Sequence, residues 1–421
     1  MNNIVEKLSV IFKNKDIRDK VLFTLLVLVT YRFMAGIPVV GIPKDALDKL
    51  FSGIGLGDVI STVSGGVLQR ASIIAIGLGP YINSSVIFQL LGTVVPKLEE
   101  LRQQGTEGRR IISMYTRWLT LPMAIFQSFV IYVTLRGFGL VGSLGRLELV
   151  AMVSSLTAGA LFMMWLGELI SESGLGGGSS TIIFFGILSA LPGRILNNYR
   201  FMDSWEFSLL LIFTIAILAV TLYIDNAERR IKIIHSRRVK EGLVANNYIP
   251  LKLTQFGVMP VIFAISLLSF PEFLAKFIAS RHLEGKWMSL ANGISNFMNN
   301  PVYQNALLFI LVVGFALFYL TVVFNTDEFA ENLQKQGAFI QRIRPGKSTS
   351  QYLRDISMKL SIVGAIFLGV LAILPNVLVS MGVWQQVIFS GTGLLILVNV
   401  VTQIKREIDS LVVLRSYDKY L

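Results

Sequence analysis

Residues 304–324 read QNALLFILVVGFALFYLTVVF, a run of 21 residues without a charged side chain. An α-helix rises about 1.5 Å per residue, so such a run is long enough to cross the ~30 Å hydrocarbon core of a bilayer. Other apolar runs repeat this pattern along the chain, and we expect spans near 21–38, 71–92, 117–136, 149–170, 180–195, 206–224, 256–279, 304–324, 357–380 and 386–403. The sequence therefore predicts an all-α polytopic membrane protein with ten transmembrane helices.

The composition agrees with a membrane protein and excludes a string of soluble domains. The chain has 421 residues, of which 53% are hydrophobic and 15% charged, and its mean hydropathy is +0.64. The first apolar run follows several lysines and is not followed by a small-residue cleavage site, so we expect it to stay attached. The chain has no cysteine, which excludes disulfides and thiolate metal sites.

The basic residues predict the orientation in the membrane. Ten spans place both termini on one side, together with the loops 96–117, 225–255 and 325–359. That side carries 27 of the 38 Lys and Arg residues. Loops that stay in the cytoplasm are enriched in Lys and Arg. We therefore predict a multi-pass protein of the cell inner (cytoplasmic) membrane with both termini in the cytoplasm.

Charge is nearly absent from the middle of the spans, where Arg32 is the one exception that the sequence indicates. Proton-coupled transporters need ionisable residues at this depth. A secondary transporter driven by buried carboxylates is therefore disfavoured, although sodium coordination by backbone carbonyls stays open. A scaffold without a pore also stays open.

Two of the basic loops have a composition suited to contacts outside the membrane. Their cationic residues are Arg229, Arg230, Arg237, Arg238, Arg342, Arg344 and Lys347. One interpretation is a docking platform for a cytoplasmic partner, and the other is topology-setting charge that contacts anionic lipids. Within 325–359 we expect a short projecting helix, capped by Thr326 and ended by Gly337, and then a turn that Gly346 permits.

A second unusual segment, residues 53–70, is apolar but too short and too glycine-rich to span. It predicts either a re-entrant piece or an interfacial helix. Its characteristic residues are Asp58, Val59, Ile60, Val63, Gly65, Gly66 and Val67.

Catalysis finds little support in the sequence. The two histidines, His235 and His282, fall in loops on opposite sides, so a His-based metal site or nucleophile is not expected. The glycine-rich stretch 174–180 lacks a Walker lysine and predicts a tight turn between two spans. Glu168 suits a capped or solvated carboxylate better than an acid catalyst. We predict no catalytic residue, no metal and no cofactor.

Six stretches of the sequence resemble one known protein family. The run GLGPYINSSVIFQLL at 77–91 resembles the second span of the SecY family, the central subunit of the bacterial protein-conducting channel. The others agree in family order: EGRRIISMYTR at 107–117, MWLGELISESGLGGG at 164–178, LKLTQFGVMPVIFA at 251–264, FNTDEFAENLQKQGAFIQRIRPGKST at 324–349 and GTGLLILV at 391–398. The sequence departs at Gln341 and Arg342, where the family usually has Pro and Gly.

The resemblance implies two inverted five-helix halves around a central pore. The halves would be 21–205 and 206–403, with a cytoplasmic segment 1–20 and a cytoplasmic tail 404–421. It places an aliphatic pore ring at Leu78, Ile82, Ile183, Ile262 and Ile396. Residues 56–68 would be a plug that fills the outer funnel. From the residues alone, ordinary helix packing is the favoured interpretation of the ring positions.

The resemblance also implies a lateral gate between the second and third spans and the seventh and eighth. Asn83 and Gln127 would be polar members of this gate, although ordinary helix–helix hydrogen bonding accounts for each of them as well. The implied function is passive transport of unfolded polypeptides and lateral release of apolar segments into lipid. The implied partners are SecE, SecG, the SecA ATPase, the ribosome, unfolded preproteins and membrane lipids, with no nucleic acid contact except ribosomal RNA.

Overall fold

The computed structural model describes residues 14–40, 72–137, 142, 145–235, 248–280, 286–323, 326–384 and 387–418. The predicted plug, residues 56–68, lies outside these ranges. So do Arg237 and Arg238 of the first basic loop.

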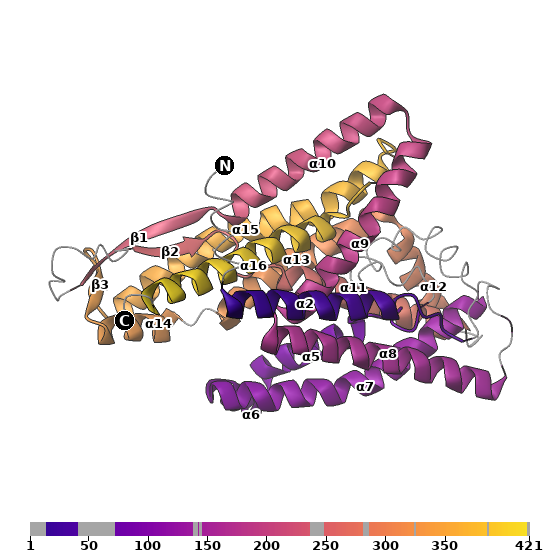
Figure 1. Ribbon diagram of the computed structural model, residues 1–421, viewed down its shortest axis with the longest axis horizontal. Coiled ribbons are helices and arrows are strands. Elements are labelled where there is room, and N and C mark those ends of the chain that lie inside the picture. The colour runs from indigo at the N-terminus through magenta and orange to yellow at the C-terminus, as the bar shows by residue number, and fades with distance from the viewer. Residues whose placement is uncertain are drawn as a thin grey trace.

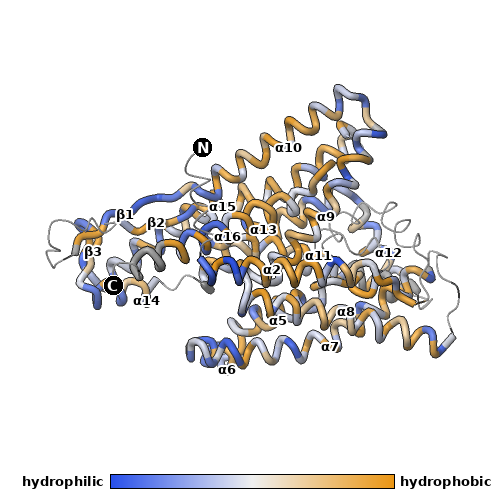
Figure 2. Tube along the Cα trace, viewed as in Figure 1, coloured by the Kyte–Doolittle hydropathy of each residue, from blue (hydrophilic) through white to orange (hydrophobic). Residues whose placement is uncertain are grey.

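Ten long helices match the ten predicted spans one by one. They are α2 (Lys15–Met34), α5 (Gly79–Val94), α7 (Thr106–Gly137), α8 (Arg146–Ser173), α9 (Gly178–Phe201), α10 (Ser204–Asp225), α11 (Met259–Ser280), α13 (Pro301–Val323), α15 (Lys347–Ser380) and α16 (Gly391–Asp418). Within the described part of the chain, six helices are long and apolar enough to cross a membrane by length and composition alone. Figure 2 shows the apolar residues concentrated along these bundle helices. The prediction of a polytopic helical membrane protein is confirmed.

The helices pack as two halves. In Figure 1, α2, α5, α7 and α8 occupy the lower part of the view, and α10, α13, α15 and α16 the upper part. Two seams join these halves. On one, which we call the α11 seam, α11 packs against both α5 and α7; on the other, α9 packs against α16. The first half therefore meets the second through α11 on one side and through α9 on the other.

A small antiparallel sheet lies at one end of the bundle, which we call the sheet end (Figure 1). Its strands are β1 (Glu228–His235), β2 (Tyr248–Lys252) and β3 (Ala338–Ile340), in the order β2-β1-β3. The short helix α14 (Thr326–Lys335) packs on β3 and α15, and a buried apolar cluster joins the sheet to both helices. The sequence predicted α14 but not the sheet, so the all-α description holds for the bundle and not for its loops.

Two further helices lie outside the ten spans. Helix α6 (Pro96–Gln103) connects α5 to α7, and α12 (Lys286–Asn299) lies at the end of the bundle opposite the sheet (Figure 1). The sequence predicted neither of them.

The two halves share a detailed internal repeat. Residues 73–78 and 253–258 form turns that lead into α5 and α11, and we call them the lead-in turns. Gly77 and Gly257 hold left-handed φ values of 61° and 62°, and Pro80 and Pro260 each follow three residues later. Glycine tolerates a positive φ and proline suits a first helical turn, so both residue types fit these places. The predicted second span is therefore helical only from Gly79 onward.

The packing around the lead-in turns repeats as well. A Cβ atom built on Gly159 of α8 would lie 2.1 Å from the carbonyl oxygen of Ile73, and one on Gly364 of α15 would lie 2.3 Å from that of Leu253. Each half thus brings a glycine of its fourth helix against the first residue of its lead-in turn. This repeat agrees with the expected pair of inverted halves.

Several helix ends differ from the hydropathy prediction. Arg32 lies in the last turn of α2 and is exposed, so the predicted mid-span charge is wrong. Helix α9 is 24 residues long and not short. Helix α16 begins at Gly391 and continues to Asp418, so most of the predicted tail is helical. Hydropathy locates apolar runs, whereas helices also continue through polar residues beyond them.

Candidate functional site

The five predicted ring residues come together in the core. Their side chains are at most 5% exposed and belong to one buried apolar cluster; they are Leu78, Ile82, Ile183, Ile262 and Ile396. They come from the start of α5 and from α9, α11 and α16, so both halves contribute.

The lead-in turns fix the position of the ring residues on α5 and α11. Leu78 lies one helical turn before Ile82, whose amide donates to the Leu78 carbonyl at 2.9 Å. Ile262 donates in the same way to the Val258 carbonyl at 3.2 Å. Val258 therefore occupies the place in the second half that Leu78 has in the first, and it is buried in the same cluster. The sequence analysis missed Val258, although the repeated Gly-x-x-Pro spacing was a signal for it.

The ring side chains are uniformly aliphatic. They are one leucine and four isoleucines. An apolar constriction resists the entry of ions because water leaves it readily, and it offers no fixed charge that would hold a passing polypeptide. The arrangement is thus suited to a seal.

The helices of the predicted gate are adjacent, but its two polar residues do not pair. Gln127 is buried on α7, and its amide oxygen lies 3.3 Å from where a Cβ on Gly79 would be. Gln127 therefore packs against α5 within the first half. Asn83 is half-buried, and the hydrogen bonds of the described residues do not join it to Gln127.

The backbone of the glycine turn between α8 and α9 is hydrogen-bonded to side chains of α2 and α16. The amide of Gly176 donates to the carboxylate of Glu407 on α16 at 2.7 Å, and that of Leu175 donates to Thr24 on α2 at 3.0 Å. Lys20 lies 3.9 Å from the same carboxylate. The predicted tight turn is confirmed, and it connects the two halves beside the contact of α9 with α16.

Two further polar groups lie near the sheet end. Glu168 forms an ion pair with Arg117 of α7 at 2.6 Å, so it is not simply a solvated carboxylate. Asp225 accepts a hydrogen bond from Thr254 at 3.0 Å and lies 3.6 Å from Arg406.

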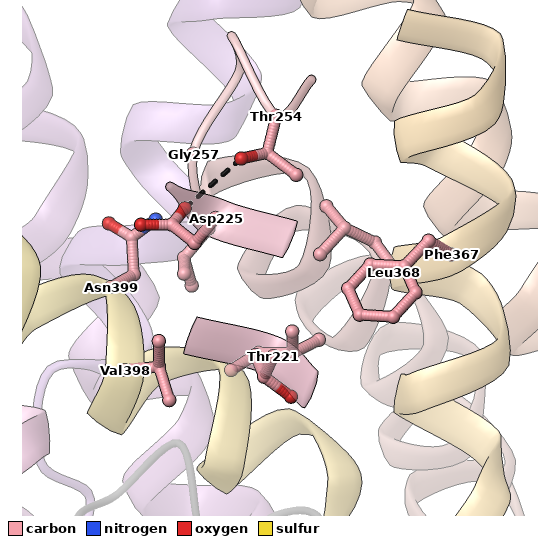
Figure 3. Close-up of a pocket in the computed structure, with 10 residues that line it drawn as sticks. Thr221, Asp225, Thr254, Gly257, Phe367, Leu368, Val398 and Asn399 are labelled. Atoms are coloured by element: carbon pink, nitrogen blue, oxygen red, sulfur yellow. Dashed lines mark hydrogen bonds between the residues drawn. The ribbon is translucent and has the colours of Figure 1, made fainter. Parts of the chain in front are cut away.

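Asp225 lines a small cavity in the second half, whose lining combines polar and apolar side chains. Figure 3 shows Asp225, Thr254 and Asn399 around it, and its volume of about 10 Å³ is close to what one water molecule needs. This cavity joins the end of α10 to the start of α11 and to α16. Val258 also lines the cavity, so the cavity borders the apolar cluster that contains the ring.

The predicted docking residues form an exposed basic surface at the sheet end. Arg342, Arg344 and Lys347 are exposed in the turn between β3 and α15, and Arg229 is exposed on β1. Arg230 differs because it forms an ion pair with Glu228 at 2.8 Å and lies 4.9 Å from the centre of the Tyr248 ring. The hydrogen bond with Glu228 raises the pKa of the Arg230 guanidinium.

The projecting helix is fixed to the bundle at its start. The Ser350 hydroxyl of α15 donates to the Asp327 carboxylate at 2.5 Å, and its oxygen lies 3.2 Å from the Thr326 hydroxyl oxygen. Gly337 follows α14 with a φ of 66°, and Gly346 precedes α15 with a φ of 96°. Both glycines take the positive φ that the sequence predicted for this loop.

Comparisons with known proteins agree with this architecture. The family model SecY matches residues 72–405. The protein translocase subunit SecY of Streptomyces griseus is 36% identical, over 97% of this chain and 98% of its own length. Protein translocase subunit SecY 1 of Lactobacillus kefiranofaciens is 37% identical, over 96% of this chain and 97% of its own.

Solved structures share the fold. A protein-conducting channel aligns with a TM-score of 0.69 at 19% identity, covering 94% of this chain and 93% of that one. Sec61 in the canine ribosome-channel complex from the endoplasmic reticulum aligns with a TM-score of 0.65 at 19% identity and the same coverage. With ten bundle helices in two repeated halves and a family match across most of its length, the chain belongs to the SecY family.

Proposed function

We propose that the chain is the channel-forming subunit of a protein translocase. It passes unfolded polypeptides across the cytoplasmic membrane and releases apolar segments sideways into lipid. The observation that carries this proposal is the aliphatic cluster, to which both halves contribute Leu78, Ile82, Ile183, Ile262 and Ile396. Such a cluster seals against ions while binding no particular side chain of a passing polypeptide.

The remaining parts of the channel follow from the same proposal. Residues 56–68 act as the plug on the outer side of the ring. The α11 seam is the lateral gate, since α11 there packs against α5 and α7. Asn83 and Gln127 line this gate as separate polar groups. A secondary transporter with the same helices would instead need ligands for a small solute at the membrane midplane.

The basic surface at the sheet end is the docking site for a driver. The chain has no catalytic step of its own in this proposal, so a cytoplasmic partner supplies the energy. The SecA ATPase and the ribosome are the proposed drivers, and a solved neighbour is described as a ribosome-channel complex. SecE and SecG are the proposed membrane partners. The sheet end and both termini then face the cytoplasm.

Ion leak tests the seal directly. The double change Ile82→Gly and Ile262→Gly removes two side chains from equivalent places in the two halves. We expect it to widen and hydrate the constriction, so that proteoliposomes holding the variant leak ions well above the level of the unaltered chain.

A matched control separates the seal from general loosening. Leu135→Gly and Leu156→Gly remove two buried aliphatic side chains from the separate cluster between α7 and α8. This control should leave the ion leak low. Equal leak from both doubles, or from neither, would contradict the proposal that the ring lines a pore.

A further inference from the structure

Helix α12 buries one side and exposes an apolar side next to it. It joins α11 to α13 at the end of the bundle opposite the sheet, and it packs on both helices (Figure 1). Ala291 and Met298 are buried and lie seven positions apart, which is about two turns, so they share the side that faces the bundle. Leu290 and Phe297 have the same spacing on a neighbouring side, but they are 56% and 42% exposed.

The remaining side of α12 is polar. Asn292 and Asn296 are exposed about one turn apart, and at about 100° per residue they lie roughly opposite Leu290 and Phe297. Single exposed apolar residues are common on protein surfaces, whereas here the exposed apolar and exposed polar residues are on separate sides. This division is typical of a helix at the boundary between membrane and water.

The exposed apolar side of α12 continues onto the surface of α13. Only Asn300 separates the two helices, and its side chain accepts a hydrogen bond from the Val302 amide at 3.0 Å. The Phe297 ring stacks on the Tyr303 ring, with the ring centres 5.3 Å apart and the planes inclined by 4°. The short turn and the stacked rings together fix how α12 meets α13.

Lipid is the expected cover of this surface on α13, whose apolar run is long enough to cross a membrane. Tyr303, Ala306, Ile310 and Gly314 are exposed at intervals of three and four residues, so they form one stripe along the helix. Tyr303 lies in the first turn of the span, and tyrosine is enriched where a span meets the membrane–water interface. Because Phe297 stacks on Tyr303, the exposed apolar side of α12 lies at the level of this interface.

We propose that α12 rests on the phospholipid surface of the leaflet opposite the sheet end, with Leu290 and Phe297 in contact with lipid. Such helices bury their apolar side to a depth of about 5–10 Å at the boundary of headgroups and acyl chains. In this position α12 holds the connected ends of α11 and α13 at the membrane surface. The inference goes beyond the proposed function, because it concerns the lipid around the protein and not the path through it.

Spin labels test the position of α12, since the chain has no cysteine of its own. Leu290→Cys and Phe297→Cys place labels on the apolar side, and Asn292→Cys and Asn296→Cys place matched labels on the polar side. Each variant is purified with its accompanying subunits, labelled, and reconstituted in vesicles of phosphatidylethanolamine and phosphatidylglycerol. Collision rates are then measured with oxygen, which concentrates in lipid, and with a nickel chelate, which stays in the water on both sides of the membrane.

We expect the ratio of oxygen to nickel collisions to be several-fold higher for both labels on the apolar side than for both labels on the polar side. A label on Ile310→Cys, farther along the stripe of α13, should give a higher ratio still. Unchanged melting temperatures of the labelled variants confirm that the fold is kept. Each side carries two labels, so the comparison holds even if one variant fails to fold.

Three results would overturn the proposal. Equal access of the nickel chelate to both sides would place α12 in water. Shielding of the labels at 290 and 297 from both reagents would mean that a second copy or an accompanying subunit covers the apolar side. A label at 310 that does not favour oxygen would show that lipid does not cover the stripe on α13.

Discussion

Arg342 holds a φ of 66°, and among the described residues it is the one non-glycine residue with a positive φ. A side chain with a Cβ atom is disfavoured in this conformation by about 1 kcal/mol or more. The position is also one where the sequence departs from the family pattern, which usually has Pro and Gly at 341 and 342. The usual glycine would fit this turn without strain.

We expect Arg342→Gly to raise the free energy of unfolding by roughly 0.5–1 kcal/mol. Glycine removes the strain of the left-handed conformation, and the larger conformational entropy of glycine in the unfolded chain offsets part of this gain. Thermal unfolding in detergent measures the change. Arg344→Gly removes the same charge two residues away, where φ is not positive, and should give no such gain. Equal shifts in the two variants would mean that lost charge, and not backbone strain, is responsible.

Single residues show which parts of the site could be predicted from the sequence. The ring positions were identified by family resemblance, and the structure brings them into one cluster. The hydrogen bond from the Gly176 amide to Glu407 could not have been predicted in this way, since 231 positions separate the two residues. Contacts of this kind depend on how the helices pack, which hydropathy does not specify.

At the scale of elements, the positions of the ten helices followed from hydropathy but their ends did not. The segment 73–78 is as apolar as a helix, so an average over a window included it in the second span. Gly77 and the Gly79-Pro80 pair were the local signal that the helix starts later. The sheet was missed because β1 and β3 pair across about a hundred residues of intervening chain.

The close packing of the fourth helix of each half on its lead-in turn gives an element-scale prediction. In Gly159→Ala and Gly364→Ala, the new methyl group would meet a backbone carbonyl, so the helix or the turn must shift. We expect each variant to lose about 1–3 kcal/mol of stability. Thermal unfolding of the purified variants checks this.

Gly314→Ala on α13 is the control, because a Cβ there meets nothing within 4 Å. It should be neutral or more stable by up to about 1 kcal/mol, since alanine favours a helix over glycine. If all three alanine variants were equally stable, the close packing at the lead-in turns would not constrain the fold.

At the scale of the whole molecule, the charged surface and the apolar bundle are separate in space (Figure 2). Arg344 is exposed in the turn between β3 and α15, outside the buried cluster that contains the ring. Arg344→Glu should therefore cut driven export of a preprotein by tenfold or more while the melting temperature stays within about 1–2 °C, because exposed residues contribute little to packing. Translocation into proteoliposomes with the driver present measures the effect.

Lys286→Glu is the matched charge reversal on α12, at the other end of the bundle, and Lys286 is exposed there. It should leave export unchanged. Equal losses of export in both variants would mean that the change in net charge, and not the position of the residue, is responsible. Normal export by Arg344→Glu would show that Arg344 is not part of the docking site.

The two lead-in turns lie 180 positions apart, hold equivalent glycines, and are followed by equivalent prolines in α5 and α11. Inverted halves present the same local geometry to the pore from opposite directions, so a given substitution meets similar neighbours in either copy. A complete map of tolerated amino acids over residues 72–82 should then resemble the map over 252–262 when one is shifted by 180. Differences between the superimposed maps would mark the places where the two faces of the membrane impose different selection.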